Sequence, residues 1–282
     1  MKKRLIIAFL CVICVVAVFA DLTDGLVAHY PFNGNANDES GNGNNGTENG
    51  ATLTIDRFGN PNSAYVFDGT DDYIALNDHY ASGNSLSQFT LSVWYKTSFS
   101  GTDYMANWSF YDFDRSEWFN VYIRGDNGKL AFSGSDGIND NFDIYADTAS
   151  NDNVWHHGVV IFDSSNNFVK FYLDGELDGT QTYSNMNPIS DSLTRYGFIG
   201  DGSEATAFDG TRNEFYYDGL IDDIRFYNRV LTEEEITELF NEGLELTAQF
   251  TVSDTAAFVG FPIHFEDSSS QLGNGILIMM EL

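Results

Sequence analysis

Oxygen-bearing side chains are concentrated in one short stretch near the start of the chain. The segment 33–46 reads NGNANDESGNGNNG, and its first half offers oxygen atoms from Asn35, Asp38 and Ser40. Calcium binds about six to eight oxygens, taken from carboxylates, amides, backbone carbonyls and water. An EF-hand is excluded, because a loop starting at Asn33 lacks the required Gly and Glu. We therefore interpret 33–40 as a candidate calcium-binding loop.

A single carboxylate interrupts an apolar row much later in the chain. In the expected strand GLIDDIRFY, alternation places Asp222 on one face with Leu220, Ile224 and Phe226. An ionised carboxylate that is buried without a partner is costly, so Asp222 needs a cation or several hydrogen bonds. Two interpretations stay open: a calcium ligand, or an acceptor of backbone N–H bonds at a strand bulge.

Aromatic and hydrogen-bonding side chains gather between residues 103 and 124. Alternation in the segment WFNVYIR sends Trp118, Asn120, Tyr122 and Arg124 to one face of a strand. Tyr, Trp and Arg are enriched at recognition surfaces, and aromatic rings stack well on the apolar faces of sugars. We predict that these four residues, with Trp108, bind a ligand. The opposite face is the expected core: Phe119, Val121 and Ile123.

Other groups suggest no further chemistry. The carboxylates of FDGTDDY (Asp68, Asp71 and Asp72) fit a solvated turn. His156 and His157 are adjacent in an expected strand, so they point to opposite faces and cannot share one metal. We find no paired carboxylates of the glycosidase kind and no Ser–His–Asp arrangement, so no catalytic residue is predicted.

Short alternating segments with Asp-Gly and Asn-Gly turns dominate residues 26–227. The segments FVKFYLDGEL and NVYIRGDNGKLAFSG both read as hairpins, and FTLSVWYK reads as a strand. One helix is predicted over 232–243, where Thr232 and Glu235 form a capping box. The predicted fold class is all-β: an antiparallel two-sheet sandwich with one short C-terminal helix.

The first 20 residues carry three basic residues and then an apolar run, which is typical of a secretory signal peptide. An uncleaved membrane anchor is the alternative, although the run is short for a bilayer span. The cysteines, Cys11 and Cys14, lie inside this run, so the secreted product contains no disulfide. The net charge of −29 argues against nucleic acid and anionic membranes as partners.

Four segments in this order resemble the laminin-G-like, concanavalin A-like jelly-roll family of secreted bacterial proteins. They are GLVAHYPFNGNANDESGNGNNGT, AYVFDGTDDYIAL, VWHHGVVIFD with FYLDGELDGT, and YDGLIDDIRFYNRVLTEEEI. The resemblance covers residues 21–246 and implies two facing antiparallel sheets, structural calcium, and binding of carbohydrate more often than catalysis. It also supports Asp38 and Asp222 as calcium ligands from the two ends of the domain.

The remaining residues, 247–282, resemble the start of a PKD-like β module. That module continues to a Trp and a Phe-Gly-Asp-Gly motif, which are absent here. The predicted organisation is therefore a signal peptide over 1–20, a jelly-roll domain over 21–246 and an incomplete PKD-like segment over 247–282.

The leading functional hypothesis is a secreted, calcium-stabilised module that binds a glycan or a cell-surface glycoconjugate, without membrane insertion after signal cleavage. One alternative is a structural or adhesive spacer that binds no small ligand. The other is a polysaccharide-degrading enzyme of the same fold. The sequence leaves the identity of the glycan and the oligomeric state open.

Overall fold

The computed structural model describes residues 21–76, 85–102, 111–114, 119–136, 142–189, 196–202, 215–244, 250–252 and 265–267. The predicted signal peptide, Trp108 and Trp118 lie outside these ranges. The chain divides into two units, Met1–Phe240 and Asn241–Leu282. In the second unit, β18 (Phe250–Val252) and β19 (Phe265–Asp267) form an antiparallel pair.

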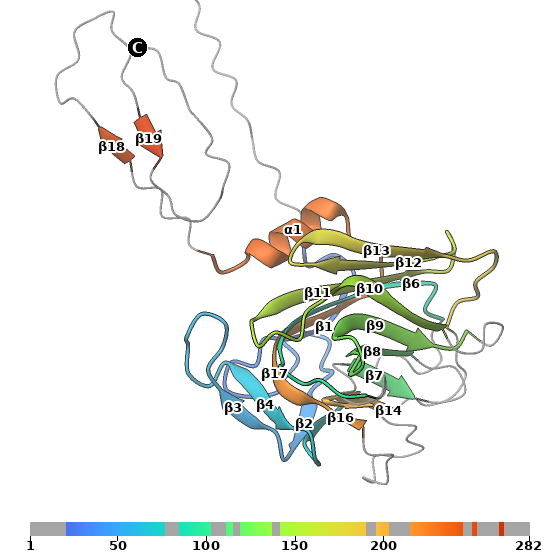
Figure 1. The fold of residues 1–282 in the computed structure, drawn as a ribbon, viewed down its shortest axis with the longest axis horizontal. Helices are drawn as coiled ribbons and strands as arrows, with labels where there is room; N and C mark the ends of the chain where they lie inside the picture. Colours follow the sequence, from blue (N-terminus) through green and yellow to red (C-terminus); the bar gives the residue numbers. More distant parts are fainter. Residues whose placement is uncertain are drawn as a thin grey trace, which may run out of the picture. The chain divides into compact units, whose positions relative to one another are not determined.

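Two antiparallel sheets make up the first unit (Figure 1). The path through the eight-stranded sheet is β13 (Glu176–Thr182), β12 (Phe168–Leu173), β11 (His156–Asp163), β6 (Gln88–Lys96), β17 (Asp218–Tyr227), β4 (Ala64–Asp68) and β3 (Thr52–Thr54), with β1 (Leu26–Tyr30) also paired to β17.

The seven-stranded sheet is also antiparallel throughout. Its order is β10 (Phe142–Ala149), β9 (Lys129–Gly134), β8 (Phe119–Ile123), β7 (Tyr111–Asp114), β14 (Tyr196–Ile199), β5 (Tyr73–Leu76) and β2 (Gly46–Asn49). A short pair, β15 (Asp201–Gly202) with β16 (Phe215–Tyr216), completes the unit. The arrangement confirms the predicted all-β, two-sheet jelly-roll sandwich with one short helix.

Phenylalanine rings fill the space between the two sheets. Phe89 of the eight-stranded sheet stacks on Phe119 of the seven-stranded sheet, with ring centroids 4.8 Å apart. Phe162 and Phe226 stack on the same ring at 5.3 and 5.4 Å. Each such pair adds about 0.5–1.5 kcal/mol to the stabilisation from burial. The inward face predicted for β8 is confirmed, since Phe119, Val121 and Ile123 are buried in this core. β6 contributes four further residues to it: Phe89, Leu91, Val93 and Tyr95.

The predicted hairpins are also present. β12 and β13 are joined through Asp174 and Gly175, which both adopt positive φ values, 51° and 84°. These backbone angles suit the tight turns whose twist matches that of the flanking strands. β8 and β9 pair in the same way across Gly128, which has a φ of 70°.

β17 lies in the middle of its sheet and contains a bulge. It pairs with β6 along one edge, and the register shifts between Asp222 and Arg225. Asp223 adopts a φ of 42°, which is uncommon for a residue other than glycine. Because a bulge inserts one extra residue, alternation does not continue through it. Ile221 and Ile224 both belong to the core, and Asp222 does not lie in their row.

The helix α1 (Glu233–Asn241) packs on the outer face of the eight-stranded sheet. Ile236 and Leu239 are buried there in a second apolar cluster, together with Val159 and Tyr227. The predicted capping box is confirmed: the Glu235 N–H donates to Thr232 Oγ1 at 3.2 Å, and the Thr232 N–H donates to a Glu235 carboxylate oxygen at 2.7 Å. These bonds satisfy two backbone donors at the start of the helix.

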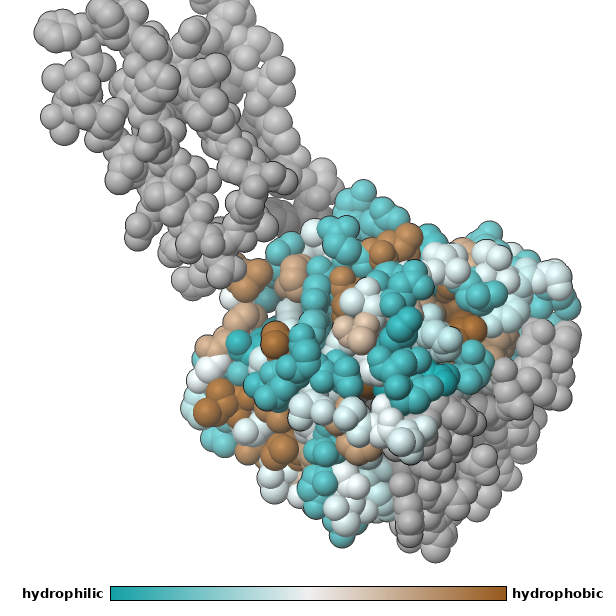
Figure 2. Space-filling model, in the orientation of Figure 1, coloured by the Kyte–Doolittle hydropathy of each residue, from teal (hydrophilic) through white to brown (hydrophobic). Residues whose placement is uncertain are grey.

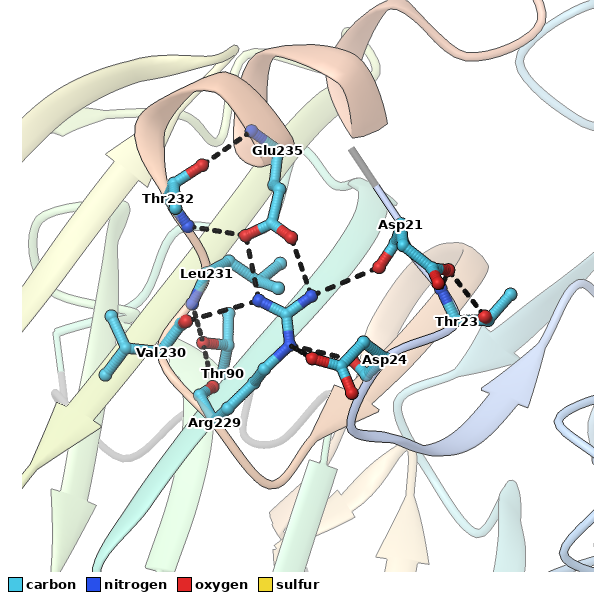
Figure 3. A network of polar contacts seen from close by, with 9 residues as sticks. All are labelled: Asp21, Thr23, Asp24, Thr90, Arg229, Val230, Leu231, Thr232 and Glu235. Atoms are coloured by element: carbon cyan, nitrogen blue, oxygen red, sulfur yellow. Dashed lines mark hydrogen bonds and ion pairs between the residues drawn. The ribbon is translucent and has the colours of Figure 1, made fainter. Parts of the chain in front are cut away.

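Arg229 connects this helix start to the first residues of the domain (Figure 3). Its guanidinium donates to both carboxylate oxygens of Glu235, at 2.6 and 2.8 Å, and to the Asp24 carbonyl at 2.7 Å. Thr90 of β6 donates to the Arg229 carbonyl at 2.8 Å. One arginine therefore joins the N-terminal turn, β6 and α1.

The face of the first unit seen in Figure 2 is largely hydrophilic, with small apolar patches between the polar residues. Among the helices in the described part of the chain, none is long and apolar enough to cross a membrane.

Candidate functional site

The predicted ligand-binding residues belong to a polar surface of the seven-stranded sheet. Cross-strand pairing places Asn120, Ser133 and Asp143 in one row across β8, β9 and β10. Tyr122, Ala131 and Tyr145 form the next row. Directly paired residues share a face of a sheet, and this face is opposite to the Phe119 core. We call its six polar and aromatic members the polar-aromatic face: Asn120, Tyr122, Arg124, Ser133, Asp143 and Tyr145.

Ionic and hydrogen bonds hold this face together. The Arg124 guanidinium pairs with Asp126 at 2.9 Å and with Asp143 at 2.9 Å. The Tyr122 hydroxyl donates to Asp143 at 3.0 Å, and burial raises the pKa of Tyr122. Arg124 also lies over the Tyr145 ring, 4.8 Å from its centroid. The side chains therefore have fixed positions.

Exposure on this face rises toward the edge of the sheet. The three described residues that were predicted to bind a ligand are buried: Asn120 is 1%, Tyr122 0% and Arg124 8% exposed. Asp143 and Tyr145 of β10 are exposed, and Tyr145 is 46% accessible. Sequence reasoning missed these two residues, although alternation in FDIYADTA places both on one face. The accessible part of the predicted face is therefore its β10 end.

A second polar cluster lies on the outer face of the eight-stranded sheet, and it corrects the face that was predicted for Asp222. Arg57 forms ion pairs with Asp222 and Asp223, and its guanidinium stacks over the Trp94 ring at 4.7 Å. The bulge in β17 turns Asp222 away from the row of Ile224 and Phe226, where alternation had placed it. Burial raises the pKa of Asp222 to about 7, against the opposing charge of Arg57. The cation expected beside Asp222 is thus an arginine side chain.

Asp223 has more partners than Asp222. It accepts hydrogen bonds from Arg225 at 3.0 Å and lies 3.0 Å from His29 Nε2. Burial alone would raise the pKa of Asp223, but the His29 bond and the charges of Arg225, His29 and Arg57 hold it well below its usual range. Sequence reasoning had assigned no role to His29.

The oxygen-rich loop is organised by Asp38. One carboxylate oxygen of Asp38 accepts the N–H groups of His29 and Ser40, both at 2.9 Å. The other oxygen accepts the Asn44 N–H at 2.9 Å. Burial opposes ionisation, but these hydrogen bonds keep the pKa of Asp38 below its usual value. The half of the loop after Gly41 thus takes part in holding Asp38.

The structure describes other partners for the four predicted calcium ligands. Asn35 accepts the Asn37 N–H at 2.8 Å, and the Ser40 hydroxyl donates to the Val27 carbonyl at 3.1 Å. Asp38 faces three N–H donors, and Asp222 faces Arg57. The calcium prediction stays untested for the chain as a whole.

Asp68, Asp71 and Asp72 lie in the predicted turn. Asp68 accepts the Thr70 N–H at 2.8 Å and the Asp71 N–H at 3.3 Å, around Gly69 with a φ of 71°. One oxygen from each carboxylate lies within 4.8 Å of the others. Burial and the charges of Asp68 and Asp71 raise the pKa of Asp72. The hydrogen-bonded turn that contains these three carboxylates agrees with the interpretation from sequence.

The two adjacent histidines have separate environments. His156 lies 2.8 Å from Asp174 and 3.1 Å from Asp152, and these carboxylates raise its pKa. His157 is fully buried, bonds to the Ser92 hydroxyl at 2.8 Å, and burial lowers its pKa to about 3.

A known protein family has the same architecture as this chain. A model of the concanavalin A-like lectin/glucanases superfamily, Laminin_G_3, matches residues 68–237, which is well over half of the chain. The chain belongs to this superfamily. The match ends before residue 247, so the PKD-like segment stays a prediction. No curated protein sequence is significantly similar to this superfamily member.

Solved structures with the same fold include several binding domains. Domain 4 of AbnA, an extracellular arabinanase from Geobacillus stearothermophilus solved in complex with arabinotriose, has a TM-score of 0.58 and 22% identity, over 76% of this chain and 97% of that one. The binding domain of Paraclostridial Mosquitocidal Protein 1 has a TM-score of 0.59 and 16% identity, over 78% and 53%. The receptor binding domain of botulinum neurotoxin D has a TM-score of 0.57 and 17% identity, over 78% and 53%. This chain therefore spans about half the length of the two toxin domains.

Proposed function

We propose that this superfamily member is a secreted module that binds carbohydrate, either as a free glycan or as part of a surface glycoconjugate. The observation that carries the proposal is the polar-aromatic face, where Asp143 and Tyr145 reach the solvent at β10 and Arg124 pairs with Asp143. Sugar recognition needs an aromatic surface for C–H groups and fixed polar groups for hydroxyls.

The fold supports the same class of ligand. The arabinanase domain was solved with a bound arabinotriose, and the toxin neighbours are binding domains. Fold similarity at this level of identity does not transfer a ligand, because one fold hosts many functions. The proposal therefore depends on the face of this chain and not on its relatives.

A glycan array followed by calorimetry on the purified chain tests the proposal. We expect saturable binding to at least one glycan class and no release of reducing sugar during incubation with that glycan. Release of sugar would establish the enzymatic alternative, for which the superfamily name leaves room. Absence of binding across the array would favour the spacer alternative.

A further inference from the structure

A groove separates the free edges of the two sheets. It lies between β10, the last strand of the seven-stranded sheet, and β13, the last strand of the eight-stranded sheet. Its volume is about 370 Å³, within the range of sites that hold small ligands. The lining residues are Asp143, Ile144, Tyr145 and Asp147 from β10, Phe171 from β12, and Gly179, Thr180 and Gln181 from β13.

Hydrogen bonds join the two edges at one end of the groove. Asp178 of β13 reaches across to β10, where it accepts the Thr148 N–H at 3.0 Å and the Thr148 hydroxyl at 2.6 Å. The pairing of β12 with β13 shifts register at this point. Gly179 follows with a φ of 152°, and a Cβ at Gly179 would lie only 3.5 Å from the Ala146 Cα. The two edges therefore meet at Asp178 and Gly179.

The lining combines an apolar base with polar walls. Phe171 belongs to the core, and Ile144 packs partly against it. Above them, β10 contributes the exposed carboxylate of Asp147, which has no hydrogen bond or ion pair to any residue that the structure describes. β13 contributes the Thr180 hydroxyl and the Gln181 amide. Carboxylates and amides can bind pairs of adjacent hydroxyl groups, and the apolar base suits C–H groups.

Tyr145 connects this groove to the polar-aromatic face. Arg124 and Lys129 both lie over its ring, at 4.8 and 5.3 Å from the centroid. These cation–π contacts fix the ring while leaving 46% of the residue exposed. A ring that is ordered before binding loses little conformational freedom when a ligand stacks on it.

The charges around the groove favour neutral ligands over anionic ones. Arg124 is shared between Asp126 and Asp143, so these three groups keep one negative charge, and Asp147 adds a second. Lys129, which lies over the Tyr145 ring, offsets only one of them, and the chain as a whole carries −29. A uronic acid or a sulfated sugar would bring a further negative charge beside the Asp147 carboxylate, and like charges repel each other. A neutral saccharide has no such penalty.

We propose that the β10–β13 groove is the saccharide-binding site and that it takes a neutral oligosaccharide, with Tyr145 as the stacking ring and Asp147 and Gln181 as hydroxyl-binding groups. This inference rests on the proposed carbohydrate-binding function, and it assigns that function to the sheet edge.

Calorimetry with neutral oligosaccharides chosen from the glycan array tests the groove. We expect Tyr145→Ala to weaken binding about tenfold or more, which is typical for loss of an aromatic anchor, and Tyr145→Phe to retain most of the affinity. Gln181→Ala is expected to weaken binding several-fold. Phe58→Ala is the matched control, because Phe58 is an aromatic residue with 43% exposure in the β3–β4 loop, and β3 is the opposite edge strand of the sheet.

The outcomes separate this inference from the proposed function. Binding that is unchanged in both Tyr145→Ala and Gln181→Ala, with all melting temperatures equal to that of the parent, would overturn the groove and leave carbohydrate binding standing. A preference for anionic over neutral sugars would overturn the charge assignment. A parent chain that binds no saccharide would overturn both proposals. If Tyr145→Ala lowers the melting temperature, amide shift changes at Thr180 and Gln181 on titration of the parent decide whether the groove is occupied.

Discussion

Arg57 is the residue on which two buried carboxylates depend. It pairs with Asp222 and Asp223, and its own side chain is packed between the Phe58 and Trp94 rings. Asp223 keeps His29 and Arg225 if Arg57 is lost. Among the described residues, the only hydrogen bond to the Asp222 carboxylate comes from Arg57. The cluster is therefore asymmetric, with Asp222 as its weakest member.

Replacing Arg57 by Met is expected to reduce the free energy of unfolding by about 3–5 kcal/mol at pH 8, the cost of leaving a buried charge without its partner. The loss should shrink toward pH 5. Burial already raises the pKa of Asp222 to about 7, so the carboxyl becomes neutral as the pH falls and no longer needs a cation. Urea denaturation at several pH values measures both effects.

The double variant Arg57→Met with Asp222→Leu is the control, because it removes the charge together with its partner. We expect it to recover much of the lost stability at pH 8. An Arg57→Met chain that unfolds at the same urea concentration as the parent at pH 8 would show that this ion pair contributes nothing.

His156 also makes the free energy of unfolding depend on pH, but here the group is a base and not an acid. Its bonds to Asp174 and Asp152 raise the pKa of His156 in the folded chain. A raised histidine pKa stabilises the fold fully below the unfolded pKa of about 6.5, and this contribution is lost as the pH rises through the folded pKa. The difference in unfolding free energy between the parent and His156→Gln should therefore be larger at pH 5.5 than at pH 9. A difference that does not vary with pH would contradict this linkage.

At the scale of elements, the hairpins and the helix follow from local sequence. Asp174-Gly175 adopts the backbone angles that such turns require, and Thr232 with Glu235 forms its reciprocal bonds, because these features depend on residues a few positions apart. The face of Asp222 could not be predicted in the same way. One extra residue at position 223 shifts the alternation in β17, and whether a strand contains a bulge depends on the partner strand as well as its own residues.

Loss of the α1 cap is expected to reduce the stability of the fold. Glu235→Ala removes the bond to the Thr232 N–H and both bonds to Arg229. We expect the free energy of unfolding to fall by about 1–2 kcal/mol, the usual range for a helix cap. Glu234→Ala is the matched control, since Glu234 lies exposed in the same helical turn. Equal melting temperatures for the two variants would contradict the role of the cap.

At the scale of the whole molecule, the candidate site depends on contacts that no single segment contains. Alternation correctly assigns Asn120, Tyr122 and Arg124 to the face opposite the core, but it cannot tell that they are buried there. The exposed residues of the polar-aromatic face, Asp143 and Tyr145, lie on β10, which is the edge strand of its sheet. The groove also needs β13, which belongs to the other sheet. Strand order is a property of the fold and cannot be read from a local pattern.

Calcium is also a question for the whole molecule. The family resemblance implies a structural ion, and calcium binding by the four predicted ligands stays a prediction. We expect any rise in melting temperature on adding calcium to the chelator-treated chain to persist in Asp222→Asn, because Asp222 faces Arg57. Loss of the calcium response in that variant would restore Asp222 as a ligand. Thermal melting with and without chelator is the measurement.

The central place of β17 has a consequence for how the chain acquires its structure. This strand lies near the end of the domain, yet it pairs with β1, β4 and β6. Contacts between distant parts of a sequence close large loops and are slow to form. During synthesis, β1 and β6 have no shared neighbour until about residue 227 has emerged, so the eight-stranded sheet cannot be completed earlier. Folding of this domain is therefore expected to follow, and not accompany, most of its synthesis.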